Sequence, residues 1–212
     1  MTLIDVTLDE LERDAMTELV NIGVSRAAAS LRKMVGKQVL LSVPSVEVMT
    51  RASAATLIRE REAGELVAVR QDFEGVFSGR ALLIFPQTNS LALVHAVTGG
   101  ALSQGEALEM EDEALAETGN VVLNSCLATM ANMLQRPLQM SLPEVLRGDG
   151  AALFSLSAKH ADGGVVLFLY INFAINDRDI RGYIAMLMDL PSLQALRTLI
   201  HDFIERVAGD VA

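Results

Sequence analysis

Apolar residues recur at steps of three and four along the first part of the chain, which predicts a long amphipathic helix over residues 8–35. Thr7 or Asp9 can cap its start, and Gly36 marks its end. The same periodicity predicts a second long helix over residues 111–135. The apolar stripe of the first helix consists of Leu8, Leu11, Ala15, Leu19 and Ile22.

Short apolar runs bounded by turn residues predict strands in the rest of the chain. The first of these runs contains Pro44, which favours an edge or bulged position there. Residues 51–63 fit neither pattern, and residues 99–112, which contain Gly, Ser, Gln and several acidic residues, are predicted to be a linker. The predicted strands are 39–48, 66–71, 75–85, 138–146, 152–158, 165–173 and 182–188, and the two shorter helices are 88–98 and 192–207.

This order of elements predicts the fold class. Each half of the chain, about 1–100 and 110–212, has the order helix, strands, helix, and the acidic linker joins the two halves. Halves of this kind can pair their sheets around a pseudo-twofold axis. We therefore expect residues 1–212 to form one α/β (α+β) domain, a tandem repeat in which two long helices pack on a mostly antiparallel sheet.

A polar motif occurs twice, 99 residues apart, once in each predicted long helix. Each copy has an acidic residue, a glutamate four positions later, an asparagine three positions further and a proline after 22 intervening residues. The copies are Asp14, Glu18, Asn21 and Pro44, and Glu113, Glu117, Asn120 and Pro143. A gapless alignment of residues 14–46 with 113–145 has eight identities in 33 positions. An internal duplication explains this match and predicts two equivalent sites.

The motif residues form one polar stripe on each helix, about 90° round from the apolar stripe. For a single copy, a solvated helix flank is the simpler interpretation. Asparagine is a poor residue in the middle of a helix, however, and it stands there in both copies. A carboxamide can accept from and donate to a water, and so hold that water in line with a phosphoryl group. A carboxylate one turn away can pair with a cation of a partner.

Composition narrows the choice of partner. A net charge of −10 argues against binding to nucleic-acid phosphates and suits a partner with a basic surface. The apolar runs are too short for membrane insertion, and residues 1–15 show no signal-peptide pattern. A single cysteine, Cys126, fits a cytoplasmic protein, and three scattered histidines give no zinc-ligand spacing.

On these residues the sequence resembles the CheC/CheX/FliY family of response-regulator phosphatases, and it looks most like CheC. That family's motif is Asp or Ser, three residues, Glu, two residues, Asn, 22 residues and Pro. Both copies match it at Glu, Asn and Pro. The second copy departs at Glu113, and Val20 stands before the first asparagine where the family often has glycine, as at Gly119. These departures predict two unequal sites, with Val20 obstructing the docking of a partner at the first one.

The resemblance implies a phosphatase that hydrolyses the aspartyl phosphate of a CheY-like response regulator. Asn21 and Asn120 would orient the attacking water, and Glu18 and Glu117 would each bond to a lysine of the receiver domain. The chain would have no cofactor of its own, because the receiver supplies Mg²⁺. CheD is a further candidate partner. Two alternatives stay open: a non-catalytic adaptor that binds a receiver or CheD, and a structural protein of the flagellar switch.

Overall fold

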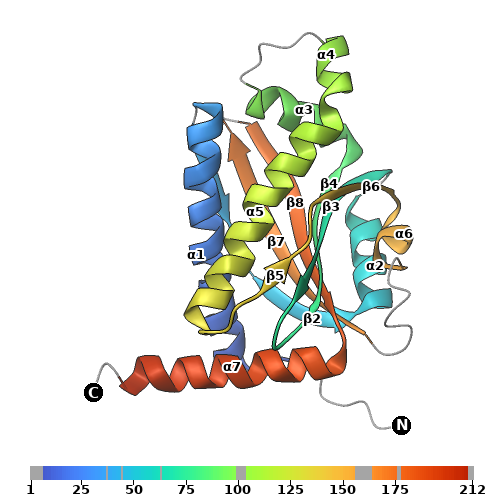
Figure 1. Ribbon diagram of the computed structural model, residues 1–212. Helices are drawn as coiled ribbons and strands as arrows, with labels where there is room; N and C mark the ends of the chain where they lie inside the picture. Colours follow the sequence, from blue (N-terminus) through green and yellow to red (C-terminus); the bar gives the residue numbers. More distant parts are fainter. Residues whose placement is uncertain are drawn as a thin grey trace.

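Two long antiparallel helices lie side by side across one face of a sheet in the computed structural model (Figure 1). They are α1, Glu10–Val35, and α5, Glu111–Met133. The structure describes residues 7–36, 38–43, 45–62, 64–98, 104–155, 164–175 and 178–209. Within these residues the mixed α/β fold, with two long helices on an antiparallel sheet, confirms the predicted fold class.

The described residues form an eight-stranded sheet in which every recorded pairing is antiparallel. The strands are β1 Val39–Ser42, β2 Val46–Thr50, β3 Leu66–Glu74, β4 Gly79–Pro86, β5 Gln139–Met140, β6 Glu144–Gly148, β7 Val165–Ile175 and β8 Arg178–Met188. The remaining helices are α2 Arg51–Arg61, α3 Gln87–Val97, α4 Gln104–Glu109, α6 Gly150–Ser155 and α7 Leu190–Gly209. None of the described helices has the length and apolar character needed to cross a membrane.

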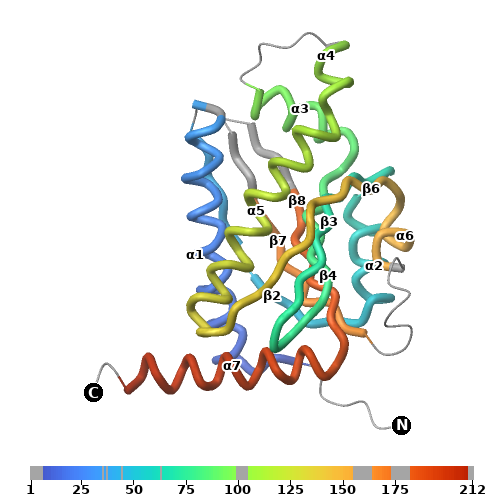
Figure 2. The backbone as a smooth tube through the Cα atoms, viewed as in Figure 1, coloured from blue at the N-terminus to red at the C-terminus, as the bar shows by residue number. Residues whose placement is uncertain are grey.

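The two halves of the chain exchange their edge strands (Figure 2). The main strand order is β1-β7-β8-β4-β3-β5, with β2 also paired to β7 and β6 also paired to β3. The edge strands of the first half therefore lie against β7 of the second half, and those of the second half lie against β3 of the first. The central pairing, β4 with β8, joins the two hairpins. Each motif helix consequently sits over a sheet to which both halves contribute.

The ends of α1 follow the prediction. Asp9 caps its start in a capping box with Glu12, and Gly36 ends it in the left-handed region at φ 66°. The predicted apolar stripe is only partly buried, because Leu11 is 57% exposed and Ile22 is half-buried. The buried side instead comprises Met16, Leu19, Val20, Gly23, Val24, Ala27 and Leu31. This side is rotated because α1 packs against α5 as well as against the sheet.

Helices α1 and α5 approach each other closely where Gly23 meets Cys126. A Cβ atom added at Gly23 would lie 2.7 Å from the Cα atom of Cys126. Only glycine therefore fits this contact without moving a helix backbone. Burial raises the pKa of the Cys126 thiol to about 12, which fits a packing role for this residue and leaves it unreactive.

Several predicted elements need correction. The predicted strands 39–48 and 138–146 are each interrupted, and Pro143 lies in the second gap because it has no N–H to donate to a ladder. Pro44 lies outside the described residues. The strand predicted over 152–158 is wrong as far as residue 155, where α6 forms instead; Asp149 Oδ1 accepts a capping bond from Ala152 N at 2.8 Å. Residues 156–158 lie outside the described part.

Two further segments form helices that the sequence did not predict. The ambiguous stretch 51–63 forms α2, whose start is capped by the side chain of Thr50. The predicted linker contains the short helix α4. Both helices lack a long apolar stripe, so the periodicity of the sequence gave little indication of them.

Candidate functional site

The structure places both glutamates of the motif on the exposed surface of their helices. Glu18 and Glu117 are exposed, whereas Asn21 and Asn120, one turn further along, are half-buried. The first copy borders a shallow depression lined by Glu18, Asn21, Ile22, Ser25, Arg26 and Ala29. In both copies the carboxylate can thus reach a partner freely, while the amide lies partly under the helix surface.

Asn21 clamps the backbone of the residue that precedes the motif proline. Its Nδ2 donates to the carbonyl oxygen of Val43 at 3.0 Å, and the N–H of Val43 donates to its Oδ1 at 2.9 Å. This pair of bonds satisfies both main-chain groups of Val43, whose side chain is buried. The spacing from Asn21 to Val43 therefore has a structural consequence: it brings the residue that follows β1 under the helix.

Asn120 makes a different set of hydrogen bonds. Its Oδ1 accepts from Gln71 Nε2 at 3.2 Å and from Asn124 Nδ2 at 2.6 Å. Gln71 Nε2 also contacts Asn124 Oδ1 at 3.3 Å and donates to the carbonyl oxygen of Ser141 at 3.0 Å. A cluster of three carboxamides therefore replaces the backbone clamp that the first copy has.

Strand pairing explains why the copies differ. Val46 pairs with Leu169 and its repeat equivalent Val145 pairs with Val69, so Val69 and Leu169 are equivalent positions. Two residues further along, Gln71 is then the equivalent of Ile171. Both are buried beneath the helices. Ile171 has no donor, and among the described residues Asn120 alone of the two asparagines receives a hydrogen bond from a side chain of the sheet.

The residue before each motif proline also differs in burial between the two copies. Val43 and Leu142 are equivalent in the repeat, yet Val43 is 1% exposed and Leu142 is 85% exposed. No recorded hydrogen bond joins Asn120 to the backbone of Leu142 among the described residues. An exposed leucine therefore stands next to the second copy, where a partner could cover it.

The two copies also differ in what their amides can still bind. A carboxamide has two N–H groups and two acceptor lone pairs. The clamp on Val43 leaves Asn21 with one of each. Both acceptor positions of Asn120 are occupied, and none of the described residues accepts a bond from its Nδ2. In this state Asn21 can both accept from and donate to a water, whereas Asn120 can only donate.

The residue before each asparagine has a packing role. Val20 is buried in the core, so its side chain does not face a docking partner, and the expected obstruction at the first copy is wrong. Gly119 faces the sheet, where an added Cβ atom would lie 2.4 Å from the Cβ atom of Val69. Glycine at this position lets α5 approach β3 closely, which also brings Asn120 within reach of Gln71.

A buried glutamate anchors the start of each motif helix. Glu12 is fully buried and accepts from Arg197 Nε of α7 at 2.9 Å, and Glu111 accepts from the hydroxyl of Ser90 in α3. The two acids lie 99 residues apart, so an alignment begun two residues earlier would have revealed them. Each acid ties its helix to the last helix of the other half.

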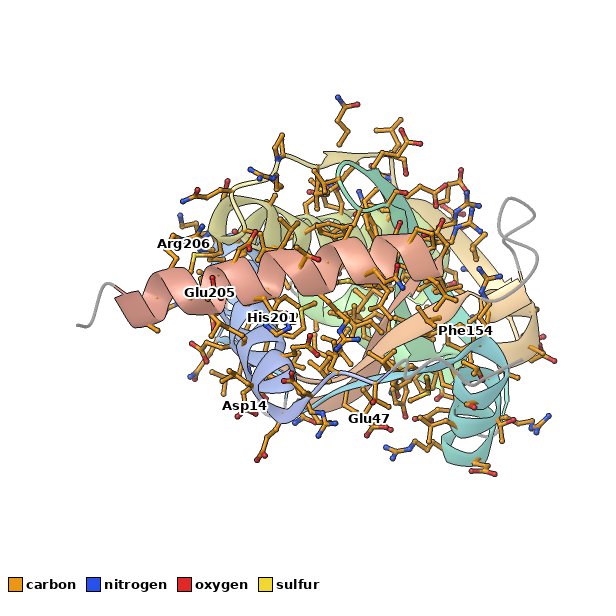
Figure 3. All side chains as sticks on the ribbon, turned by 90° about the horizontal axis from the view of Figure 1, so that it is seen from below. Asp14, Glu47, Phe154, His201, Glu205 and Arg206 are labelled. Atoms are coloured by element: carbon orange, nitrogen blue, oxygen red, sulfur yellow. The ribbon has the colours of Figure 1, made fainter. Side chains whose placement is uncertain are left out.

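One group of side chains has the spacing of metal ligands. Asp9, Glu12 and His201 each offer a ligand atom, and these atoms lie within 4.8 Å of one another. Figure 3 shows His201 on the side of α7 that faces α1. Glu12 already receives hydrogen bonds from Arg197 and from the backbone of Asp9. The capping box and the contact between α1 and α7 account for this arrangement.

The relatives found by comparison with known proteins agree with the resemblance that the motif indicates. No family model matches the sequence. The chain is 26% identical over 140 residues to the flagellar motor switch phosphatase FliY of Bacillus subtilis, across 65% of this chain and 36% of that protein. It is 21% identical over 199 residues to the CheY-P phosphatase CheC of Bacillus subtilis, across 89% of this chain and 93% of that protein.

Solved structures share the fold. The Thermotoga maritima FliY crystal structure has a TM-score of 0.72 at 17% identity and covers 92% of this chain and 98% of that chain. The FliM middle domain from H. pylori has a TM-score of 0.61 at 9% identity and covers 91% of this chain and 99% of that chain. The chain therefore shares its α/β fold with the Thermotoga maritima FliY structure. Sequence relatives and fold together support the resemblance to the CheC/CheX/FliY family that the motif predicts.

Proposed function

We propose that this chain is a phosphatase that hydrolyses the aspartyl phosphate of a CheY-like receiver domain. The observation that carries the proposal is the repeated surface arrangement of an exposed glutamate and a half-buried asparagine one turn further along the helix. The relatives named CheY-P phosphatase and flagellar motor switch phosphatase support the class of reaction. Because the chain spans only 36% of FliY, the activity of that whole protein is transferred here only as a proposal.

The amide of each asparagine would orient the attacking water. The water oxygen bonds to phosphorus while the bond from phosphorus to the aspartyl oxygen breaks, which releases inorganic phosphate and restores the carboxylate. Catalysis in such a reaction is mainly positioning and charge stabilisation. Asn21 retains an acceptor and a donor for this task in the structure described above. Asn120 retains only its N–H groups, so its contribution at rest is that of a donor.

Glu18 and Glu117 would fix the docking position by pairing with a cation of the receiver, a lysine in the resembling family. Both carboxylates are exposed, which suits a contact at the rim of an interface. The Mg²⁺ ion would come with the receiver and would stabilise the charge of the phosphoryl group. The acidic balance of the chain favours a partner with a basic surface.

A second candidate function is a binding module that holds a receiver or a CheD-like protein without hydrolysis. The observation that favours it is the engagement of both asparagine amides inside the chain. Catalytic hydrogen bonds often form only in the complex with substrate, so this engagement is compatible with the enzyme as well. A measurement of turnover separates the two functions.

The test is phosphate release from a panel of phosphorylated receiver domains, with and without this protein. We expect faster release for at least one receiver, at catalytic rather than stoichiometric amounts of protein. The Asn21→Ala/Asn120→Ala double variant should lose this effect. Asn132→Ala, which changes an exposed asparagine near the end of α5, is the matched control. Binding of a receiver without faster release would support the binding module instead.

A further inference from the structure

We propose that Gln71 is a positioning residue that holds Asn120 with its N–H groups directed toward a docked partner. This inference rests on the proposed function, since it gives a role to the same asparagine. Gln71 lies in β3 of the first half, whereas Asn120 lies in α5 of the second half. The second copy of the motif therefore depends on a residue that the repeat itself does not contain.

Burial fixes the side chain of Gln71. It is 1% exposed and sits under α5, with Nε2 within hydrogen-bond distance of three oxygens, those of Asn120, Asn124 and the Ser141 carbonyl. A carboxamide nitrogen has two hydrogens, so two of these three contacts share one hydrogen. The main-chain carbonyl oxygen of Ser141 can only accept, which directs Nε2 of Gln71, and not Oε1, toward these neighbours.

The consequence for Asn120 is a choice between two orientations. The terminal torsion of an asparagine is broad and roughly two-fold, so an unconstrained amide can present either its oxygen or its nitrogen outward. Gln71 and Asn124 both donate to Oδ1. Turning the amide over would place Nδ2 against these two donors. The oxygen is therefore held inward, and the two N–H groups remain for an external acceptor such as a phosphoryl oxygen or a water.

The Oε1 atom of Gln71 shows that this position is not optimised for packing alone. It is buried and has no hydrogen-bond partner among the described residues. Buried polar atoms are normally paired, so an unpaired one calls for an explanation. Ile171 fills the equivalent place in the first copy without any polar atom. A glutamine at position 71 is explained if the site uses its N–H donors and not its volume.

The experiment compares Gln71→Met and Gln71→Glu in the Asn21→Ala background, so that only the second copy can act. Methionine keeps the length of the side chain but removes the donor, and glutamate at neutral pH replaces the donor with an acceptor. We expect kcat for receiver dephosphorylation to fall on the order of tenfold to a hundredfold, with KM within about twofold. Gln87→Met, which removes another carboxamide with a buried Oε1 away from the motif, is the control and should keep the activity.

A direct readout does not depend on turnover. The side-chain amide resonances of Asn120 in the free protein should shift in both Gln71 variants and stay unchanged in Gln87→Met. If Asn120→Ala has no effect on turnover in the Asn21→Ala background, the proposed function of the second copy fails. If Asn120→Ala abolishes turnover while both Gln71 variants keep kcat and leave the Asn120 resonances unmoved, the positioning role is overturned and the proposed function stands. A variant that unfolds is recognised by circular dichroism, and the other variant then decides.

Discussion

The two copies of the motif have a glutamate and an asparagine at the same places on their helices, but the two asparagines are held by different kinds of group. Asn21 is clamped on the main chain of Val43, while Asn120 is held by the side chains of Gln71 and Asn124. The difference comes from the sheet below, where one copy has a glutamine and the other an isoleucine. A duplicated motif therefore gives two similar surfaces, and the neighbour that the other half supplies changes how each asparagine is hydrogen-bonded.

The largest expected effect concerns the asparagines themselves. Asn21→Ala and Asn120→Ala should each leave partial phosphatase activity, and the double variant almost none. Loss of the orienting amide should slow its own site on the order of 10²-fold, or roughly 2.7 kcal/mol of activation free energy. Steady-state phosphate release by the three variants measures this. A double variant as active as the wild type would rule out both copies as catalytic sites.

The glycine between α5 and β3 tests how the second copy of the motif is packed. Gly119→Ala pushes a Cβ atom to 2.4 Å from Val69, and we expect the free energy of unfolding to fall by about 1–3 kcal/mol. Gly105→Ala in α4 is the control, because an added Cβ atom meets nothing within 4 Å there. Urea denaturation measures both. Equal stability of Gly119→Ala and the wild type would show that α5 does not need this close approach to β3.

Stability should also separate the two asparagines. Asn21→Ala leaves the N–H and carbonyl of Val43 without their partner, which should cost about 1–3 kcal/mol. In Asn120→Ala, Gln71 and Asn124 can still bond to one another, so we expect a smaller loss, about 1 kcal/mol. Thermal and urea unfolding of the single variants provide the comparison. The opposite ranking would mean that the carboxamide cluster, and not the backbone clamp, is the stronger structural element.

Substitution of the glutamates should have a smaller effect, because exposed ion pairs contribute little free energy. Glu18→Gln and Glu117→Gln should raise KM for the phosphorylated receiver a few-fold and leave kcat nearly unchanged. Added salt should raise the wild-type KM in the same direction, since screening weakens such contacts. Kinetics at two ionic strengths test this. A fall in kcat with KM unaltered by salt would assign the carboxylates to the chemical step.

The smallest expected signal is metal binding by this protein alone. The group of Asp9, Glu12 and His201 lies at the start of α1, where Arg197 already neutralises the buried carboxylate. We expect calorimetry with Mg²⁺ to show no micromolar binding in the absence of a receiver. Should an isotherm appear, His201→Ala and Glu18→Gln would show whether the ion sits at this group or at the motif itself.

The sequence predicted those features that depend on local patterns or on the repeat. The capping of α1 by Asp9, its end at Gly36 and the arrangement of two helices on one sheet follow from periodicity and duplication. The contact between Gln71 and Asn120 could not be predicted, because the two residues lie in different halves and the repeat places an isoleucine at the equivalent of Gln71. The hydrogen bonds between Asn21 and Val43 were not predicted for a related reason. Its partner is a main-chain group, which no side-chain pattern reveals.

The exchange of edge strands has a consequence for biosynthesis. Val46 meets Leu169 in the finished sheet, so the first half emerges from the ribosome with its edge strands unpaired and the apolar face of α1 uncovered. The chain is synthesised at roughly 5–20 residues per second, so these surfaces stay uncovered for several seconds before β7 is available. Contacts of such long sequence separation also slow folding. During this interval only the β3–β4 hairpin of the sheet can form, and a chaperone bound during synthesis would protect the rest of the first half from aggregation until the second arrives.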